Sequence, residues 1–115
     1  MQPTRRNQRL ALQIQQEISM MLFRNVKDRR IGLVTVTGVE LSSDLRHAKV
    51  FFSTMGNEKE KSESMEALNH AAGWIRRTLG QRIRMKFLPE IVFRVDTSQE
   101  YGERIDRLLD EIKED

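Results

Sequence analysis

The architecture of this chain depends most on residues 62–86, which read SESMEALNHAAGWIRRTLGQRIRMK. Its apolar residues recur at spacings of three and four, at Met65, Leu68, Ala72, Ile75 and Leu79. That period predicts an amphipathic helix from about residue 62 to residue 82. Gly73 interrupts the pattern near its middle, because glycine costs about 1 kcal/mol relative to alanine inside a helix. The helix therefore either runs straight through residue 73 or bends there.

Trp74 distinguishes these two possibilities. On an ideal helix its side chain lies roughly opposite the apolar stripe, so the tryptophan is exposed unless a bend at Gly73 redirects it. An exposed tryptophan can stack on an unpaired base, which contributes about 1–3 kcal/mol. We favour packing in the core or at the bend, and leave stacking on RNA open.

The second half of the stretch is strongly basic. Between residues 74 and 86 there are five cations and no acid: Arg76, Arg77, Arg82, Arg84 and Lys86. Like charges this close repel one another, and phosphates relieve the repulsion when they neutralise them. Arginine also matches phosphate with two parallel hydrogen bonds from its planar guanidinium. We therefore predict an RNA contact here; the alternative is that these arginines pair with the acidic C-terminus.

Apolar periodicity predicts the elements on either side of this helix. The expected order is a helix over about 4–23, strands over 31–42 and 46–53, the long helix, a strand over 85–95 and a helix over 98–113. This order predicts an α+β domain in which helices cover one face of a three-stranded sheet.

Turn-forming residues refine this prediction at three places. Ser42-Ser43-Asp44 predicts a tight turn, so the first two strands form an antiparallel hairpin. Gly38 predicts a bulge or a close backbone contact within the first strand, and Pro89 interrupts the third strand near its start. Residues 54–61 are polar and contain Gly56 and Asn57, which predicts a loop.

The length and charge of the chain fit one small domain with a polarised surface. Its 115 residues suit a single domain that ends in an acidic helix at 98–115. Residues 99–115 hold seven acids and three bases, a net charge of −4; since the whole chain carries +3, residues 1–98 carry +7. A polyanion would meet that basic body. No segment approaches the ~20 apolar residues that span a bilayer and no signal peptide is evident, so we expect a cytoplasmic protein.

The sequence lacks the residue patterns of common catalytic, metal and cofactor sites. It has no cysteine and no HExxH, GxSxG, GxGxxG or Walker-type motif. His47 and His70 lie on different predicted elements without a paired spacing, and we expect both on the surface. We therefore expect no catalytic residue, no metal and no cofactor.

Six motifs follow one another in a characteristic order. They are RR at 5–6, KDRRI at 27–31 with VTVTGV at 34–39, SDL at 43–45 with AKV at 48–50, AAGWIR at 71–76, PEIVF at 89–93 with Asp96, and the segment 102–109. In this order they resemble the ribosome-binding factor A family over nearly the whole chain. One position departs from the family, which commonly has proline after the loop aspartate, whereas Asp28 is followed by Arg29.

The resemblance implies a type II KH-like fold, in the order helix-strand-strand-helix-helix-strand. It implies that a kink between two helices, formed here by Ala71, Ala72 and Gly73, replaces the usual G-x-x-G loop; the six glycines of this chain never fall in that spacing. It also implies a non-catalytic role in late maturation of the immature small (30S) ribosomal subunit, including 5′-end processing of 16S rRNA. Release with help from a ribosome-associated GTPase and a greater need in the cold are further implications.

The predicted RNA contacts combine the basic cluster with five further arginines: Arg5, Arg6, Arg9, Arg29 and Arg30. We expect the small ribosomal subunit and its rRNA as partners, no membrane, and a monomer in solution. Two other functions remain open from the residues alone. One is a general single-stranded nucleic-acid binder, and the other is a protein–protein adaptor whose acidic last helix masks the basic body.

Overall fold

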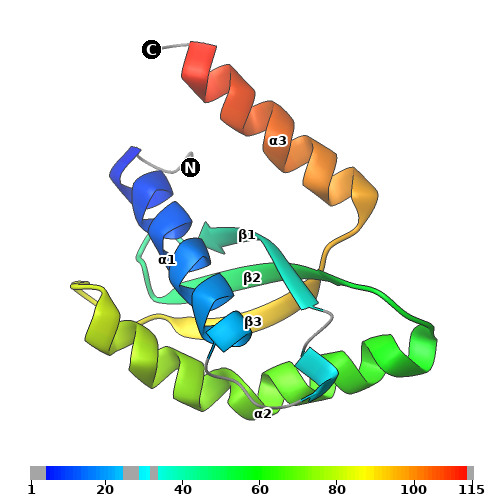
Figure 1. Cartoon of the computed structure of the whole chain (residues 1–115). Coiled ribbons are helices and arrows are strands. Elements are labelled where there is room, and N and C mark those ends of the chain that lie inside the picture. The colour runs from blue at the N-terminus through cyan, green and yellow to red at the C-terminus, as the bar shows by residue number, and fades with distance from the viewer. Residues whose placement is uncertain (1–4, 25–28, 32–33, 114–115) are drawn as a thin grey trace.

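The computed structural model describes residues 5–24, 29–31 and 34–113, with the backbone alone at 29, 98–101, 104 and 111–113 (Figure 1). The elements follow in the order α1 (Arg5–Arg24), the 3-10 helix η1 (Arg29–Ile31), β1 (Val34–Leu41), β2 (His47–Thr54), α2 (Glu58–Arg82), β3 (Glu90–Val95) and α3 (Ser98–Lys113). The predicted α+β class and the predicted order of helices and strands are confirmed.

The three strands form one mixed sheet in the order β1-β2-β3. β1 and β2 pair antiparallel, as the predicted hairpin requires, whereas β2 and β3 pair parallel across the long connection that contains α2. The register between β1 and β2 shifts between Val36 and Gly38, which confirms the bulge predicted at the glycine. β3 begins only after Pro89, a buried residue that lacks the N–H needed for strand pairing.

α1 and α2 share a hydrophobic core with one face of the sheet. α1 contributes four buried side chains and α2 contributes its apolar stripe, and the strands complete the core with Val36, Val50, Phe52 and Phe93. The rings of Phe52 and Phe93 meet edge to face, with centroids 6.4 Å apart. α1 also runs alongside β1, so α1 and α2 cover one face of the sheet as predicted.

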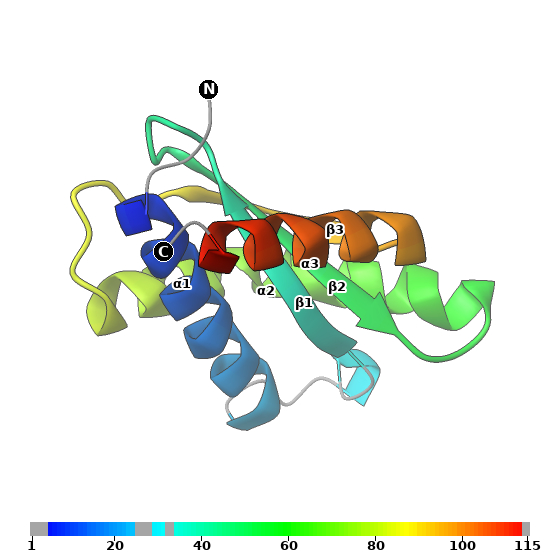
Figure 2. The same cartoon turned by 90° about the horizontal axis from the view of Figure 1, so that it is seen from above.

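α3 departs from that prediction, because it lies across the opposite face of the sheet in both views (Figures 1 and 2). It is held there by Arg107, whose Nη2 donates to Glu40 Oε1 of β1 at 3.0 Å. The physical reason is that α1 and α2 already fill the first face, while the second still presents Phe51 and Val92. α3 packs loosely there: a cleft of about 770 Å³ lies beside it, and Leu109 remains 51% exposed.

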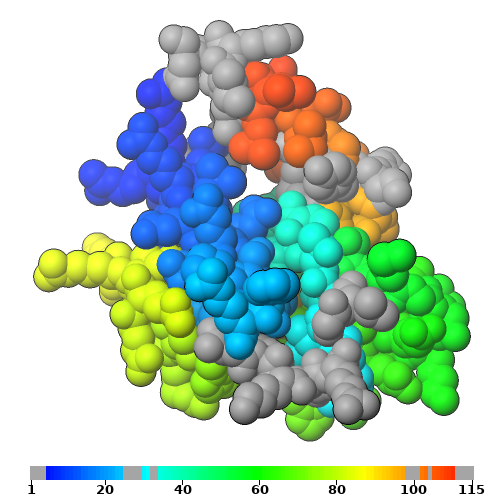
Figure 3. All heavy atoms as spheres, viewed as in Figure 1, coloured from blue at the N-terminus to red at the C-terminus, as the bar shows by residue number. Residues whose placement is uncertain are grey.

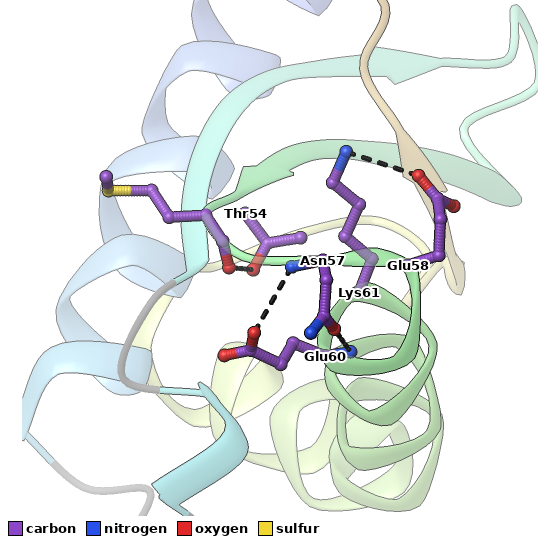
Figure 4. Close-up of polar contacts among 6 residues, drawn as sticks. Thr54, Asn57, Glu58, Glu60 and Lys61 are labelled. Atoms are coloured by element: carbon purple, nitrogen blue, oxygen red, sulfur yellow. Dashed lines mark hydrogen bonds and ion pairs between the residues drawn. The ribbon is translucent and has the colours of Figure 1, made fainter.

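α2 is one continuous α-helix of 25 residues, and it begins four residues before the predicted start. Its first turn is closed by a capping box (Figure 4): Asn57 Oδ1 accepts from the Glu60 N–H at 2.9 Å, and the Asn57 N–H donates to Glu60 Oε1 at 3.2 Å. The loop predicted over residues 54–61 is therefore too long. The helix is also not divided into two at Gly73, although its ribbon changes direction near the middle in Figure 1.

Candidate nucleic-acid interface

Most of the predicted RNA-binding residues come together at one end of the molecule. The first turns of α1, the β1–β2 turn and the segment that follows α2 all lie at that end in Figures 1 and 2. We call the seven predicted residues gathered there the basic end: Arg5, Arg6, Arg9, Arg77, Arg82, Arg84 and Lys86. They are distant in sequence, and the packing of α1 against α2 brings them to one side of the molecule.

Several cations of the basic end point into solvent. Arg6 and Arg9 on α1 are exposed, as are Arg77 on α2 and Arg84 and Lys86 just after it. In Figure 3, side chains from the start of α1 and from the end of α2 project from the same edge of the molecule. Exposed cations with long side chains can reach a phosphate backbone without moving the fold. This edge therefore has the charge and the accessibility that a polyanion requires.

Arg76 has a different environment from its neighbours in sequence. Its Nε donates to the carbonyl oxygen of Pro89 and its Nη2 to that of Leu88, both at 3.0 Å. Its Nη2 also lies 3.9 Å from Glu90 Oε1. These contacts fasten the segment before β3 to the side of α2. Arg76 therefore holds the segment after α2, which carries Arg84 and Lys86, against the helix.

Two other predicted residues pair with acids of the protein itself. Arg82 Nη1 lies 3.7 Å from Glu17 Oε2 and so joins the end of α2 to α1. Arg30 lies away from the basic end, where its Nη1 is 3.9 Å from Glu66 Oε2 and its carbonyl oxygen accepts from buried Ser64 at 2.9 Å. The side chain of Arg29 is outside the described residues.

Gly73 and Trp74 lie on the solvent side of α2. A Cβ built on Gly73 would meet only Arg77 Nη1, at 3.5 Å, so neither tertiary packing nor an unusual φ requires glycine there. Trp74 is 37% exposed and is not part of the hydrophobic core. Of the two placements that we favoured for Trp74, the core and the bend, packing in the core is therefore wrong. The reason is that α2 continues through Gly73, which leaves the tryptophan away from the apolar stripe.

Sequence reasoning missed Arg46, which joins the basic end from the β1–β2 turn. Its guanidinium carbon lies 4.3 Å from the centre of the Phe87 ring, and Lys86 Nζ lies 5.5 Å from the same centre. A signal was present, because Arg46 follows a Ser-Ser-Asp turn where side chains are exposed. Its partner could not be identified, since residues 46 and 87 lie in different connecting segments that are far apart in the sequence.

The β1–β2 turn itself is tightly hydrogen-bonded. Asp44 Oδ1 accepts from Ser42 Oγ at 2.6 Å and from the Arg46 N–H at 3.0 Å. These two bonds, the serine bond foremost, hold the pKa of the Asp44 carboxyl below its ordinary value of 3.8. Leu45 adopts a left-handed conformation with φ of 65°. The turn therefore presents Arg46 from a fixed backbone.

No group of three or more His, Cys, Asp or Glu side chains within the described residues could hold a metal ion. His47 and His70 are both exposed, as predicted. No described helix is long and apolar enough to cross a membrane.

Comparison with known proteins places this architecture in a family. The model of the family described as ribosome-binding factor A matches residues 6–109. The ribosome-binding factor A of Halothermothrix orenii is 51% identical over 96% of this chain and 90% of its own length. That of Microcystis aeruginosa is 50% identical over 96% of this chain and 88% of its own length.

Solved structures share the fold. A Thermotoga maritima protein solved by solution NMR has a TM-score of 0.72 and 35% identity, covering 85% of this chain and 93% of its own. The crystal structure of ribosome-binding factor A from Thermus thermophilus has a TM-score of 0.69 and 26% identity, covering 77% and 94%. A homology model of the Thermus thermophilus factor, fitted into a cryo-electron microscopy map of its complex with the 30S subunit, has a TM-score of 0.63, 26% identity, and coverage of 76% and 92%.

Proposed function

Since the chain belongs to the ribosome-binding factor A family, we propose that it binds the immature small ribosomal subunit and promotes late maturation and 5′-end processing of its 16S rRNA. The observation that carries the proposal is family membership over residues 6–109, joined to a basic end exposed on the same domain. A Thermus thermophilus relative has been fitted into a map of its 30S complex, which supports the same partner for this chain. The protein acts by binding and not by catalysis, as a monomer, and a ribosome-associated GTPase assists its release.

The basic end is the RNA-binding surface in this proposal. Arg77, Arg84 and Lys86 contact phosphates from one side, and Arg6 and Arg9 contact them from α1. These five cations are exposed, and contacts to phosphates supply most of the sequence-independent affinity for nucleic acid. Arg76 and Arg82 support the surface by fixing the segments around it, as their contacts within the protein indicate, whereas Arg30 lies away from it and pairs with Glu66.

The exposed face of α2 around Gly73 allows close approach of the RNA backbone. Glycine leaves a bare helix surface one turn before Arg77, and Trp74 stands beside it with 37% of its surface exposed. A backbone that lies against this face could bond to Arg77 while an unpaired base stacks on the tryptophan. The kink expected over Ala71, Ala72 and Gly73 becomes, in this proposal, a bend within a continuous helix.

Sedimentation through a density gradient tests the proposal. The protein should travel with free small subunits, above all immature ones, and only weakly with translating ribosomes. An Arg77→Glu/Arg84→Glu variant should lose affinity for small subunits by about tenfold or more at low salt, because two phosphate contacts become repulsive. The matched control is Lys59→Glu/Lys61→Glu, which makes the same charge change at the other end of α2, where the helix dipole favours acids.

Two results would contradict the proposal in different ways. If the native protein stayed at the top of the gradient at low salt, subunit binding itself would be wrong. If both double variants lost affinity equally, binding would depend on net charge and not on the basic end. Competition with random single-stranded RNA distinguishes a subunit-specific factor from a general single-strand binder. The competitor would displace a general binder from the subunits when the two are present at comparable concentrations.

A further inference from the structure

Phe87 lies between two cations that come from different parts of the chain. Arg46 reaches it from the β1–β2 turn, with the guanidinium carbon 4.3 Å from the ring centre, and Lys86 reaches it from the neighbouring position, with Nζ at 5.5 Å. Both distances are within the ~6 Å at which an aromatic ring attracts a cation. The ring therefore favours positions near it for two side chains that are otherwise exposed to solvent.

The two charges are close together, and no carboxylate among the described residues forms a salt bridge with either of them. From the two ring distances, the guanidinium carbon and Nζ are at most 9.8 Å apart, about one Debye length (~8–10 Å) at physiological salt, so their repulsion is only partly screened. Asp44, on the same turn, attracts the charge of Arg46 but directs its Oδ1 to Ser42 and to the Arg46 N–H, so it forms no salt bridge with the guanidinium. An anion bound at both cations would relieve this repulsion.

The backbone that carries these side chains is held from several sides. The Glu90 N–H donates to the Arg46 carbonyl oxygen at 2.8 Å, so the turn and the segment before β3 are bonded to each other. Arg76 fastens the same segment to α2 through the carbonyls of Leu88 and Pro89. Leu88 packs closely on Gly80, where a Cβ would lie 3.2 Å from its Cδ1. A site built in this way binds with little loss of conformational freedom.

We propose that Arg46, Lys86 and Phe87 form a phosphate-binding clamp, in which the ring holds the two cations for successive phosphates of one RNA strand. This inference rests on the proposed function, because the RNA in question is that of the small subunit. It adds a contact from the β1–β2 turn, on a different element from the α1 and α2 cations. Phe87 positions the two cations and does not itself contact a phosphate.

The salt dependence of binding tests the clamp, because each phosphate contact contributes a fixed slope. The affinity of native protein and variants is measured for purified small subunits, and separately for a short labelled RNA hairpin, over a fourfold range of salt. For Arg46→Ala and for Lys86→Ala, the slope of log affinity against log salt concentration should become shallower by about 0.7–0.9. Raising the salt fourfold should then weaken the binding of each variant about 3-fold less than it weakens the binding of the native protein. The double variant should show twice that change in slope. Lys59→Ala, an exposed cation at the other end of α2, should leave the slope as it is.

Phe87→Leu separates positioning from charge. It keeps an apolar side chain and both cations but removes the attraction of the ring, so affinity should fall while the salt slope stays close to that of the native protein. Melting temperatures within a few degrees of native would show that each variant is folded. Native slopes for both single variants on both RNAs, or native affinity for Phe87→Leu, would overturn the clamp. If the native protein failed to bind subunits but the hairpin slopes changed as expected, the proposed function would be wrong and the clamp would stand.

Discussion

At the scale of single residues, Asp44 couples the geometry of the β1–β2 turn to pH. Hydrogen bonds from Ser42 Oγ and from the Arg46 N–H favour the charged carboxylate, so its pKa in the folded protein is below the value of 3.8 that applies to the unfolded chain. A lowered pKa contributes stability above pH 3.8. That contribution is lost as the pH falls through the folded pKa.

We expect Asp44→Ala to lower the free energy of unfolding at neutral pH, and this difference from the native protein to shrink below pH 3.8. Urea unfolding at a series of pH values measures it. Ser43→Ala is the control, since Ser43 is an exposed neighbour in the same turn. A difference between native and Asp44→Ala that stayed constant with pH would mean that these bonds do not stabilise the carboxylate.

Gly73 and Gly80 give opposite expectations for the same substitution in the same helix. A Cβ at Gly73 meets only the end of Arg77 at 3.5 Å, whereas a Cβ at Gly80 lies 3.2 Å from Leu88 Cδ1. Gly73→Ala should therefore raise the free energy of unfolding by about 0.5–1 kcal/mol, the usual gain in helix propensity, with an unchanged denaturant slope. Gly80→Ala should gain less or lose stability, because Leu88 must move.

The proposed approach of RNA at Gly73 adds a binding result to this stability result. Gly73→Leu places a bulky side chain on the bare face of α2 and should weaken binding to small subunits in sedimentation while the protein remains folded. A folded Gly73→Leu variant with native binding would argue against close approach of RNA at this position.

At the scale of elements, the start of α2 depends on one capping residue. Asn57 accepts from the Glu60 N–H, and its own N–H donates to the Glu60 carboxylate (Figure 4). Asn57→Ala removes the side-chain acceptor and should cost about 1 kcal/mol in the free energy of unfolding, measured in urea, whereas Asn57→Asp should be close to neutral. Equal losses for alanine and aspartate would mean that the cap is not what stabilises the first turn.

The same element shows what the sequence could and could not predict. The apolar stripe of α2 was visible as a period, and so were the strands and the bulge at Gly38, because each depends on neighbours in sequence. The predicted loop over 54–61 correctly includes Gly56, at φ 121°, and Asn57, but Asn57 caps α2 and residues 58–61 already belong to the helix. Turn residues mark an element boundary, and their type alone does not tell how soon after them the next element begins.

The candidate site was predictable as a charge pattern but not as a set of roles. Arg76 and Arg77 are adjacent and chemically identical, yet the first bonds to two carbonyl oxygens of the segment before β3 and the second points into solvent. The sequence did not predict a role for Arg46, because its partner Phe87 lies in a connecting segment far from it in the sequence. Such assignments follow from tertiary packing, which brings together segments that have no periodic relation in the sequence.

At the scale of the whole molecule, the acidic last helix lies near the basic end. α3 crosses the outer face of the sheet, and its C-terminal end is directed toward the first turns of α1 in Figures 1 and 2. Three of its acids, Glu103, Asp106 and Asp110, are exposed. Their negative potential opposes that of Arg6 and Arg9 and should lower the affinity for RNA at low salt, where screening is weak.

Neutralising these three acids should therefore tighten binding. We expect Glu103→Gln/Asp106→Asn/Asp110→Asn to raise the affinity for a labelled RNA hairpin several-fold at low salt. As the salt concentration increases, the affinity of this variant should approach that of the native protein. Because the three side chains are exposed, the melting temperature should stay nearly unchanged. The control is Arg107→Gln, which removes the bond to Glu40 that holds α3 on the sheet but leaves the acids in place. If α3 acts by its charge where it lies, the triple variant gains affinity and Arg107→Gln does not. If Arg107→Gln alone gained affinity, α3 would act by covering the surface beneath it, and the electrostatic explanation would be wrong.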